Sequence, residues 1–404
     1  MRAVVWHGIG DIRLDNVPEP KIHEPTDAIV RLTASAICGT DLHMVRGTFP
    51  GMRPGTILGH EGVGVVEEVG RDVRNLNIGD RVVIPSTIGC GVCSYCRDGY
   101  YAQCDRANPN GPDAGTAFFG GPVDTGPFNG LQAEFARIPF ASTGPVKLPE
   151  EVSDDQAIMI SDIFPTGYFG ADIAGIKPGN TMAIFGCGPV GQFAIASAKM
   201  MGAGRIFAVD TVQSRLDMAR AQGAEVIDFN AEDPTDALKR LTGGIGPDRV
   251  IDAVGVDAEP AQHGPAAKEA VEHQVQFQKE LRQIAPETHP QGNLWQPGKA
   301  PSQVLSWAVK AAAKAGTIAI IGVYPPSAQS FPIGKAMNKN LTINMGNCNH
   351  RRYIPKLVDM VRTGQFDPQT VLTQQEPLTD AIEAFKAFDQ RQKGWMKVEL
   401  KLAA

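Results

Sequence analysis

The second half of the chain, from residue 180 onward, alternates short apolar strands with amphipathic helices. The strand-like segments TMAIFG, RIFAVD, AEVIDF and DRVIDAVG are separated by the helix-like segments PVGQFAIASAKMMGA, VQSRLDMARAQ and PTDALKRLTG. Strands that alternate with helices of this length form βαβ units, which build a parallel sheet with helices on both faces. The sequence therefore predicts an α/β domain with a doubly wound parallel sheet.

A glycine-rich turn joins the first of these strands to its helix. Gly186, Gly188 and Gly191 give the pattern G-x-G-x-x-G, and the helix opens with Pro189 and Val190. The first glycine permits a tight turn, the second lets the backbone approach a pyrophosphate, and the third allows close packing of helix on strand. The phosphates then lie at the helix N-terminus. This order predicts a dinucleotide site, and the alternative is a structural turn that binds no nucleotide.

The residue that discriminates between NAD and NADP ends the next strand. Asp210 lies about 20 residues beyond the turn, where a carboxylate accepts hydrogen bonds from the ribose 2′-hydroxyl and repels a 2′-phosphate. We therefore predict NAD. A guanidinium at Arg215 is able to accommodate a phosphate, but with Asp210 in place we expect it to flank the adenosine. Val254 and Gly322, near the ends of two later strands, are further predicted cofactor contacts.

The first half of the chain has a different pattern, in which short strands are separated by Gly, Pro and Asp. The segments are AVVWHG, DAIVRLTASAI, EGVGVVEEVG, DRVVIPS and QAEFARIP. Their spacing predicts an antiparallel, barrel-like β unit. A length of 404 residues favours two or three domains. We place the β domain at 1–158, the α/β domain at 159–325 and a closing segment at 326–404.

An insertion interrupts the alternation at about residues 256–301. It is polar and rich in Gln, Pro and Ala, and its pattern predicts one short amphipathic helix near EAVEHQVQFQKELRQI. The alternation resumes with the helix SQVLSWAVKAAAKAG and the strand TIAIIGVY. The closing segment, with the helices RRYIPKLVDMVRTG and TDAIEAFKAFDQR and the strand WMKVELKL, is expected to complete the parallel sheet and return to the β domain.

Charge and hydropathy exclude several classes of partner. The chain has 38 basic and 44 acidic residues, a formal charge of −6, without a run of like charge, so nothing favours nucleic acid. The N-terminus lacks the basic and apolar regions of a secretory signal. Apolar stretches are broken before the roughly 18 residues that a membrane helix requires. The sequence predicts a soluble, cytoplasmic protein with no membrane span.

Four of the seven cysteines crowd into one short loop. They form the pattern C-x2-C-x2-C-x7-C at Cys90, Cys93, Cys96 and Cys104. An odd number of cysteines without a secretory signal favours reduced thiols, and four thiolates surround one tetrahedral zinc in structural sites. An iron–sulfur cluster, disulfides and free thiols are the alternatives. Cys187 and Cys348 have no partner at metal spacing, so we expect them to be small buried hydrophobes.

Two other residues suggest a second metal site. Cys38 opens the segment CGTDLH, and His60 lies in GHE. Alone, either residue is more often structural than a ligand. Together they fit a catalytic zinc, which needs three protein ligands from Cys, His and carboxylate side chains and one open position for water or substrate oxygen.

These motifs in combination resemble the medium-chain zinc-dependent alcohol dehydrogenases. The resemblance rests on C-G-T-D-x-H, G-H-E-G-x-G-x-V-x-x-V-G, G-D-R-V, the four-cysteine loop and the later glycine turn. It covers nearly the whole chain outside the insertion. It implies a GroES-like β-barrel catalytic domain beside a Rossmann NAD-binding domain, with two zinc ions per chain.

The third ligand of the catalytic zinc selects a branch of that family. Many members place a second cysteine there, whereas the matching stretch here, MISDIFPTGY, has Asp162. This pattern is similar to the glutathione-independent formaldehyde dehydrogenases and formaldehyde dismutases. The alternative for Asp162 is a helix-capping carboxylate.

The resemblance also implies a mechanism. Zinc polarises the substrate oxygen, hydride passes to the nicotinamide, and Thr40 with His43 relays the proton outward. Glu61 resembles the family's acidic residue that approaches the metal, and Asp41 resembles the carboxylate that orients the ligand histidine. Thr166 matches a position that packs against the nicotinamide.

The expected activity is NAD-linked oxidation of a primary alcohol or an aldehyde hydrate. Possible pocket residues are the aromatics Phe49, Phe118, Phe119 and Phe164. The alternatives are a catalytically inactive or regulatory relative, a polyol dehydrogenase and a zinc-free quinone reductase of the same fold. The family forms dimers or tetramers, and we expect a homotetramer.

Overall fold

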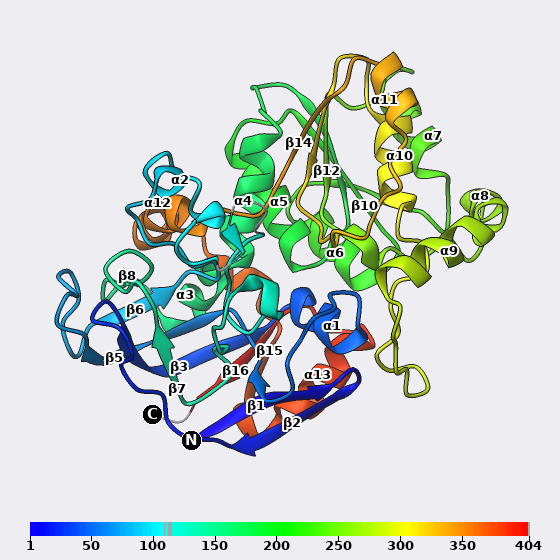
Figure 1. Ribbon diagram of the computed structural model, residues 1–404. Coiled ribbons are helices and arrows are strands. Elements are labelled where there is room, and N and C mark those ends of the chain that lie inside the picture. The colour runs from blue at the N-terminus through cyan, green and yellow to red at the C-terminus, as the bar shows by residue number, and fades with distance from the viewer. Residues whose placement is uncertain (109, 112–114, 403–404) are drawn as a thin grey trace. The chain divides into compact units, whose positions relative to one another are not determined.

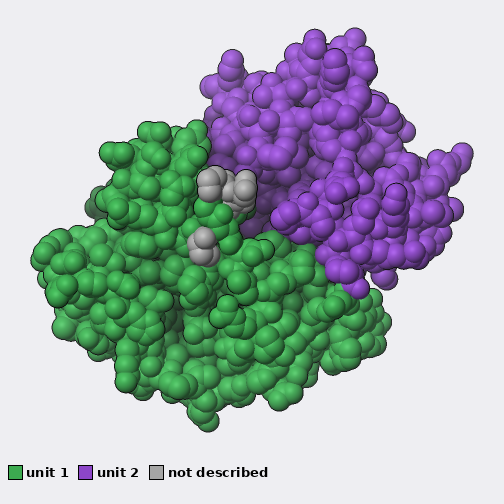
Figure 2. Space-filling model, viewed as in Figure 1, with its two compact units in different colours: residues 1–165, 287–296, 347–404 green, residues 166–286, 297–346 purple. Residues whose placement is uncertain are grey.

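The computed structural model describes residues 1–108, 110–111 and 115–402. They divide into two compact units, which Figure 2 colours separately. Unit 1 comprises residues 1–165, 287–296 and 347–404, and unit 2 comprises residues 166–286 and 297–346. Each unit is therefore assembled from stretches that are far apart in sequence.

Unit 2 is built on a parallel sheet (Figure 1). Figure 1 labels three of its strands, β10, β12 and β14. Among the described residues this sheet has six strands in the order β11-β10-β9-β12-β13-β14, and every neighbouring pair is parallel. The strands are β9 (Thr181–Phe185), β10 (Arg205–Asp210), β11 (Glu225–Asp228), β12 (Arg249–Asp252), β13 (Thr317–Ile320) and β14 (Thr342–Met345). The order reverses beside β9, as in a Rossmann sheet, which confirms the predicted fold class.

Side-chain alternation along the strands explains why helices cover both faces of this sheet. In β9, Ile184 points into one apolar core and Phe185 into another, because successive strand residues face opposite sides. The first core includes α5 (Pro189–Met200) and α6 (Gln213–Ala221). The second includes α7 (Pro234–Leu241), α10 (Gln303–Ala311) and α11 (Ile333–Asn338). Both faces are buried, as parallel sheets require.

The insertion holds two helices, so the single helix that its pattern predicts is wrong. α8 (Ala266–Glu272) ends at His273, and α9 (Gln274–Ile284) begins there. His273 has φ −97° and ψ 3°, outside helical values. Its ring nitrogen Nδ1 lies 2.9 Å from Glu269 O, so the side chain competes for an acceptor of the helical ladder. Apolar spacing continues through this break and gives no sign of it.

Unit 1 is mainly antiparallel β-structure. Its described residues form a larger sheet in the order β15-β16-β3-β5-β6-β8, with β7 also paired to β3, and a smaller sheet in the order β2-β1-β4. Only β15 and β16 pair in parallel within it. The strands are β1 (Arg2–Gly8), β2 (Asp11–Asn16), β3 (Ala28–Ile37), β4 (Thr56–Ile57), β5 (Gly62–Val69), β6 (Arg81–Ile84), β7 (Phe135–Ile138), β8 (Val146–Lys147), β15 (Gln374–Pro377) and β16 (Val398–Lys401).

The N-termini of α1 and α3 in unit 1 have well-defined caps. In α1 (Gly39–Arg46), Asp41 Oδ2 accepts the backbone N–H of the N-cap residue Cys38 at 2.9 Å. In α3 (Asp154–Ser161), Ser153 and Gln156 form a reciprocal capping box, an arrangement that stabilises a helix by about 1 kcal/mol. The other helices are α2 (Ser94–Arg97), α4 (Ile163–Ile173, which continues into unit 2), α12 (His350–Arg362), α13 (Ala381–Asp389), η1 (Tyr101–Gln103), η3 (Val123–Thr125), η5 (Pro368–Val371) and η6 (Leu378–Asp380); unit 2 adds η4 (Gly255–Asp257).

A ten-residue piece of the insertion, residues 287–296, belongs to unit 1, and we call it the strap. Trp295 is buried, and its backbone N–H donates to Asp389 Oδ2 at 2.8 Å. The same carboxylate forms a buried ion pair with Arg46 at 2.8 Å. Gly47 has a φ of 83°, and a Cβ there would lie 2.3 Å from Glu287 O. The strap is thus packed closely into unit 1, which its polar composition does not reveal.

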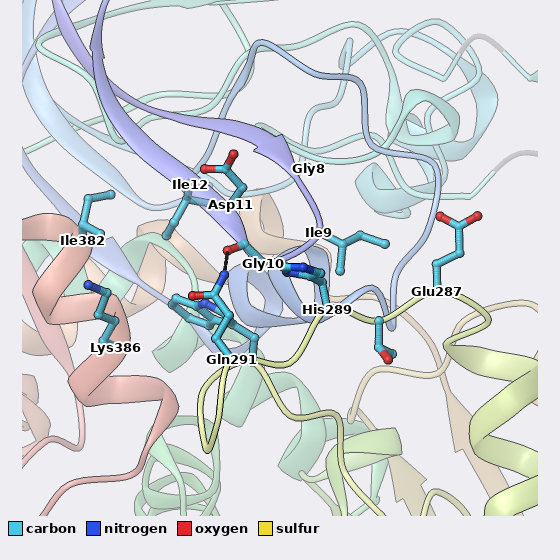
Figure 3. Close-up of a pocket in the computed structure, with 12 residues that line it drawn as sticks. Gly8, Ile9, Gly10, Asp11, Ile12, Glu287, His289, Gln291, Ile382 and Lys386 are labelled. Carbon is cyan, nitrogen blue, oxygen red and sulfur yellow. Dashed lines mark hydrogen bonds between the residues drawn. The ribbon is translucent and has the colours of Figure 1, made fainter.

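A cavity of about 650 Å³ lies where the strap meets the β1–β2 turn and α13 (Figure 3). Gln291 crosses one side of it and donates from Nε2 to Gly10 O at 3.0 Å. Lys386 lines it from α13. The predicted metal ligands are not among its lining residues.

The observed units differ slightly from the expected boundaries. Unit 1 extends to residue 165, beyond the expected 158, because α3 packs against β3, β5 and β6. Unit 2 extends to residue 346, because β14 completes the parallel sheet before α12 returns to unit 1. No helix in the described ranges is both long enough and apolar enough to cross a membrane.

Candidate metal and cofactor sites

Cys38, His60, Glu61 and Asp162 meet in unit 1. One potential ligand atom of each lies within 4.8 Å of the ligand atoms of the others, and all four residues are buried. Cys38 follows β3, His60 and Glu61 precede β5, and Asp162 ends α3. Three distant parts of the chain are therefore brought together by the β3–β5 pairing and by α3 packing on these strands.

His60 lies with one ring nitrogen towards this cluster and the other towards Asp41. Its Nε2 is 3.5 Å from Asp162 Oδ2, and its Nδ1 is 3.2 Å from Asp41 Oδ1. Asp41 is itself held by Cys38 N and by Gln132 Nε2, which donates at 3.3 Å. An imidazole bound to a metal usually donates its other N–H to a carboxylate or carbonyl. Asp41 therefore lies where it can fix the orientation of His60.

The two oxygens of Asp162 have different surroundings. Oδ1 accepts from His350 Nε2 at 2.7 Å and from Ser86 Oγ at 3.0 Å. Oδ2 lies 3.6 Å from Cys38 Sγ and 3.5 Å from His60 Nε2. One edge of the carboxylate is thus bonded to protein donors, and the other faces the thiol and the imidazole.

Glu61 pairs with a fully buried lysine from the last strand. Lys397 Nζ donates to Glu61 Oε1 at 2.5 Å and to Ile37 O at 3.1 Å, and both charged side chains are 0% exposed. Among the residues that the structure describes, none hydrogen-bonds to the buried Glu61 Oε2. A buried carboxylate oxygen in this state is suited to a cation.

The members of the cluster also shift one another's pKa values. Burial raises the pKa of the Cys38 thiol, although His60 opposes this. Burial opposes charge on His60, yet Asp41 and Cys38 outweigh it and hold the His60 pKa well above its usual value. Burial likewise opposes charge on Asp162, but hydrogen bonds from His350 and His60 hold its pKa well below the ordinary range. A thiol, an imidazole and a carboxylate form a donor set that zinc binds, so these residues fit the metal.

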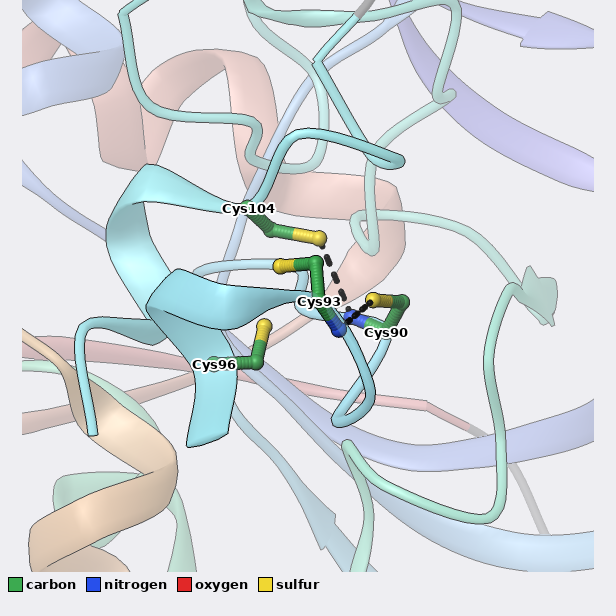
Figure 4. Close-up of side chains that lie close together, drawn as sticks. All are labelled: Cys90, Cys93, Cys96 and Cys104. Atoms are coloured by element: carbon green, nitrogen blue, oxygen red, sulfur yellow. Dashed lines mark hydrogen bonds between the residues drawn. The ribbon is translucent and has the colours of Figure 1, made fainter. Parts of the chain in front are cut away.

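The four cysteines of the loop also lie together, as Figure 4 shows. The sulfurs of Cys90, Cys93, Cys96 and Cys104 lie within 4.8 Å of one another, and no disulfide joins any cysteine of the described chain. Backbone N–H groups point at two of the sulfurs. Cys90 N donates to Cys104 Sγ at 3.2 Å, and Cys93 N donates to Cys90 Sγ at 3.4 Å.

These contacts favour a thiolate at Cys104. A hydrogen bond from the Cys96 thiol lowers the pKa of Cys104 to about 4, and the same interaction raises the pKa of Cys96. Thr143 Oγ1 supports the loop by donating to Cys90 O at 3.1 Å. Four sulfurs around one point fit a closed tetrahedral zinc site.

The predicted relay residues lie on α1 next to the cluster. Thr40 and His43 are three residues apart, so they share one face of the helix. His43 is buried, and its Nδ1 lies 2.7 Å from Thr48 Oγ1. This contact fixes the imidazole ring.

Of the predicted pocket aromatics, Phe118 contacts His60 directly and Phe49 packs on Phe118. The Phe118 ring meets the His60 ring edge-on, with 6.1 Å between centroids, and Phe49 stacks on Phe118 at 6.2 Å. Phe119 lies in the hydrophobic core of unit 1, and Phe164 packs against Phe366 at 5.0 Å. Phe49 and Phe118 thus form an apolar wall beside the cluster.

The glycine turn of unit 2 has the features that its sequence predicts. Gly186 has a φ of 88°, in the left-handed region that glycine adopts without strain. Gly188 is the N-cap of α5, with Pro189 and Val190 in its first turn. A Cβ at Gly191 would lie 1.9 Å from Gly186 O, so only glycine allows this approach of helix to strand.

Asp210 is held against the glycine turn. Its Oδ2 accepts Cys187 N at 2.8 Å, and its Oδ1 accepts Thr211 N and Val212 N at 2.7 and 2.9 Å. Arg215 Nη1 lies 3.9 Å from Oδ2 and is the nearest side-chain group to the Cβ position of Gly188, at 3.7 Å.

The remaining predicted cofactor residues in unit 2 lie at the ends of neighbouring strands. Val254 follows β12, and its Cγ2 lies 2.5 Å from the Cβ position of Gly186. Gly322 follows β13, and a Cβ there would lie 2.2 Å from Gly255 N. These residues line the carboxyl edge of the sheet, where such folds bind nucleotides. Thr166 lies in α4. Cys187 and Cys348 are buried, as predicted.

Three residues of the metal cluster escaped sequence analysis. Ser86, His350 and Lys397 belong to no motif, and they reach the cluster only through tertiary contacts. A weak signal existed for Lys397, because WMKVELKL places lysines between apolar residues of a strand. Ser86 and His350 gave none.

Comparisons with known proteins identify the family of this chain. Residues 24–150 match the alcohol dehydrogenase GroES-like domain, and residues 189–262 match the zinc-binding dehydrogenase family. The zinc-type alcohol dehydrogenase-like protein AdhB of Bacillus subtilis (strain 168) is 38% identical over 405 residues, which cover 99% of this chain and 100% of that protein. The chain belongs to the medium-chain zinc-dependent alcohol dehydrogenase family. This dehydrogenase is therefore an oxidoreductase of a family that uses zinc and a nicotinamide cofactor.

This dehydrogenase is also similar to a curated formaldehyde dehydrogenase and to a solved alcohol dehydrogenase structure. The glutathione-independent formaldehyde dehydrogenase of Pseudomonas aeruginosa (strain PAO1) is 39% identical over 282 residues, covering 67% of this chain and 69% of that protein. Among solved structures, alcohol dehydrogenase TADH from Thermus sp. ATN1 superposes with a TM-score of 0.81 at 31% identity, over 100% of both chains.

Proposed function

We propose that this dehydrogenase oxidises a primary alcohol or an aldehyde hydrate with NAD, using a catalytic zinc bound by Cys38, His60 and Asp162. The observation that carries this proposal is the convergence of Cys38 Sγ, His60 Nε2 and Asp162 Oδ2. Similarity to a formaldehyde dehydrogenase supports an aldehyde or small primary alcohol as the substrate.

The protein residues would hold the substrate and remove its proton. When bound, zinc acts as a Lewis acid that lowers the pKa of an alcohol oxygen. Phe49 and Phe118 exclude water from one side of the cluster. We assign Thr40 the role of accepting the alcohol proton and His43 the role of passing it outward, because imidazole exchanges protons near neutral pH. The contact of His43 with Thr48 keeps the ring in place for this transfer.

Glu61 has a supporting role in the same proposal. Its Oε1 accepts a hydrogen bond from Lys397, and its buried Oε2 has no hydrogen-bond partner in the described chain. We propose that Glu61 would offer a further carboxylate oxygen to a bound ion, with Lys397 balancing its charge.

The second zinc is assigned to Cys90, Cys93, Cys96 and Cys104. Four sulfurs leave no position open for a substrate, so this ion supports the fold and takes no part in the reaction. The sulfur-directed N–H groups of the loop stabilise thiolate there.

The preference for NAD rests on Asp210. The carboxylate accepts three backbone N–H groups and retains acceptor capacity, since a carboxylate has about four lone-pair sites. A 2′-hydroxyl can use the remaining site, whereas a 2′-phosphate would meet a fixed negative charge. The positive end of α5 suits the pyrophosphate.

The central experiment combines metal analysis with a substrate screen followed by cofactor absorbance. We expect two zinc ions per chain and NADH formation with formaldehyde or short primary alcohols. A preference for secondary polyols would make the protein a polyol dehydrogenase. Less than one zinc per chain would favour a zinc-free reductase, and no NADH formation by the zinc-loaded protein would favour an inactive relative.

Cofactor choice is tested by Asp210→Ala. Loss of a hydrogen bond to a charged group and of the repulsive charge should shift the ratio of kcat/KM for NAD over NADP by about 10–100-fold towards NADP. Asp228→Ala, which removes the carboxylate that ends the neighbouring strand β11, is the control and should leave the ratio unchanged. An unchanged ratio in Asp210→Ala would refute the assignment.

We also propose a homotetramer. The strand β14 is the outer strand of the described parallel sheet, and Met345 on it is largely exposed. Light scattering of the eluted protein should give four chains, and a monomeric mass would refute this.

A further inference from the structure

We infer that His350, assisted by Ser86, is a positioning residue that binds one oxygen of Asp162 and thereby presents the other to the catalytic metal. This inference rests on the proposed metal site and deepens it. It starts from the unequal contacts of the carboxylate: Oδ1 accepts two hydrogen bonds, whereas Oδ2 faces Cys38 and His60.

His350 lies behind a ligand and is not itself part of the ligand group. The set whose potential ligand atoms lie within 4.8 Å of one another is Cys38, His60, Glu61 and Asp162, without His350. His350 Nε2 lies 2.7 Å from Asp162 Oδ1, a short distance for a charge-assisted hydrogen bond. Its ring is buried.

The Asp162 carboxylate determines which ring nitrogen of His350 carries the donated hydrogen. An ionised carboxylate only accepts hydrogen bonds, so Nε2, which lies 2.7 Å from Asp162 Oδ1, is the donor. The other ring nitrogen, Nδ1, lies 3.1 Å from Thr87 Oγ1. A doubly protonated ring also carries a hydrogen on Nε2, so the role does not depend on the charge of His350.

The residues on both sides of His350 are anchored by their side chains to the four-cysteine loop region. Asn349 Oδ1 accepts Ala102 N at 2.9 Å. Arg351 Nε donates to Thr143 O at 2.5 Å, and Thr143 in turn donates to Cys90 O. His350 therefore starts α12 from a fixed point, and its side chain is directed at Asp162.

This arrangement selects one mode of metal binding. A carboxylate binds a metal through one or both oxygens, and two donors on Oδ1 leave Oδ2 as the ligand atom. Partners of this kind typically change metal affinity by about 10–100-fold. His350→Leu should therefore weaken zinc at this site by about 10–100-fold and leave the four-cysteine site unchanged.

The test measures the zinc dissociation constant of each site by competition with a chelator, in the full-length protein. Cobalt substitution separates the sites, because a four-thiolate centre and a centre with one thiolate absorb differently. His350→Gln keeps an N–H donor and should restore affinity to within about threefold, whereas Ser86→Ala, which removes one neutral donor, should weaken it by about 2–10-fold. His289→Leu, in the strap, is the matched control and should change nothing.

Three results would overturn the inference. They are an unchanged dissociation constant in His350→Leu, equal weakening at both sites with a lower unfolding temperature of the metal-free chain, and no recovery in His350→Gln. An unchanged dissociation constant in His350→Leu, or no recovery in His350→Gln, would refute the positioning role of His350. The wild-type protein would still bind two ions in either case, so the proposed function would stand. A wild-type protein that binds one ion, at the four cysteines alone, would refute the proposed function and this inference together.

Discussion

The two sulfur-containing clusters of unit 1 are held together in different ways. The four cysteines lie within one short loop, and its own backbone N–H groups bond to their sulfurs. The cluster of Cys38, His60 and Asp162 comes from three distant segments. Asp41, beside Cys38 in the chain, supports it together with side chains from still other segments, namely Ser86, His350 and Lys397. A local site needs little from the rest of the fold, whereas a dispersed site is only as well ordered as the contacts around it.

The largest effect on stability should come from the local cluster. Cys96→Ser removes one of four thiolates, so we expect loss of one zinc ion per chain. A structural zinc contributes folding energy directly, and the free energy of unfolding should fall by more than about 5 kcal/mol. Urea unfolding and metal analysis measure these losses. Cys187→Ser, at a buried cysteine outside both clusters, should keep both ions; if both variants behave alike, the loop holds no structural metal.

The dispersed cluster should instead control activity. Asp162→Ala removes a predicted ligand, and kcat/KM should fall by about 10³-fold or more, equivalent to about 4 kcal/mol. The zinc of the four cysteines should remain. Steady-state kinetics with metal analysis measure both quantities. Activity within tenfold of the wild type would show that Asp162 is a capping residue and not a ligand.

The charged support of the dispersed cluster should affect folding strongly. Lys397→Met leaves Glu61 buried without its cation, which should cost about 3 kcal/mol or more in the free energy of unfolding. Lys386→Met, in the exposed pair with Glu383 at 2.7 Å, is the matched control and should cost less than about 1 kcal/mol. The double variant Glu61→Gln with Lys397→Met should recover part of the loss. Equal costs in the two lysine variants would show that burial of this pair has no energetic consequence.

The smallest change in the free energy of unfolding is expected for a side chain that supports the four-cysteine loop from a distant position in the chain. Thr143→Val removes the hydrogen bond to Cys90 O and should cost about 1 kcal/mol. Both zinc ions should remain bound. Thermal unfolding measures this cost. Thr370→Val, which replaces an exposed threonine, is the control. Loss of zinc from Thr143→Val would mean that the loop depends on its neighbours as much as the dispersed cluster does.

The same difference explains what the sequence predicts well. The four-cysteine loop and the glycine turn are visible in sequence because all their essential residues are close together in the chain. The strands and helices of unit 2 follow from hydrophobic periodicity. Cys38, His60 and Asp162 were found through motifs, although each comes from a different segment.

Several tertiary contacts and one helix break have no signal in the local sequence. His350 bonds to Asp162 across 188 residues, and Lys397 bonds to Glu61 across 336. The strap is polar and without periodicity, so its place in unit 1 depends on contacts of Trp295 and Gln291 that only the fold creates. The break between α8 and α9 depends on the backbone angles of one residue, His273. These details follow from tertiary packing, which overrides local preference.

The pairing of β16 with β3 has a consequence for biosynthesis. Val398 pairs with Ile37, the residue before Cys38, while the last stretch of unit 2 ends at residue 346. Chains emerge from the ribosome from the N-terminus at about 5–20 residues per second. The parallel sheet of unit 2 is thus fully translated before β16, the strand that pairs with β3 next to Cys38. We therefore expect the metal cluster to be completed late in synthesis, after the sheet of unit 2.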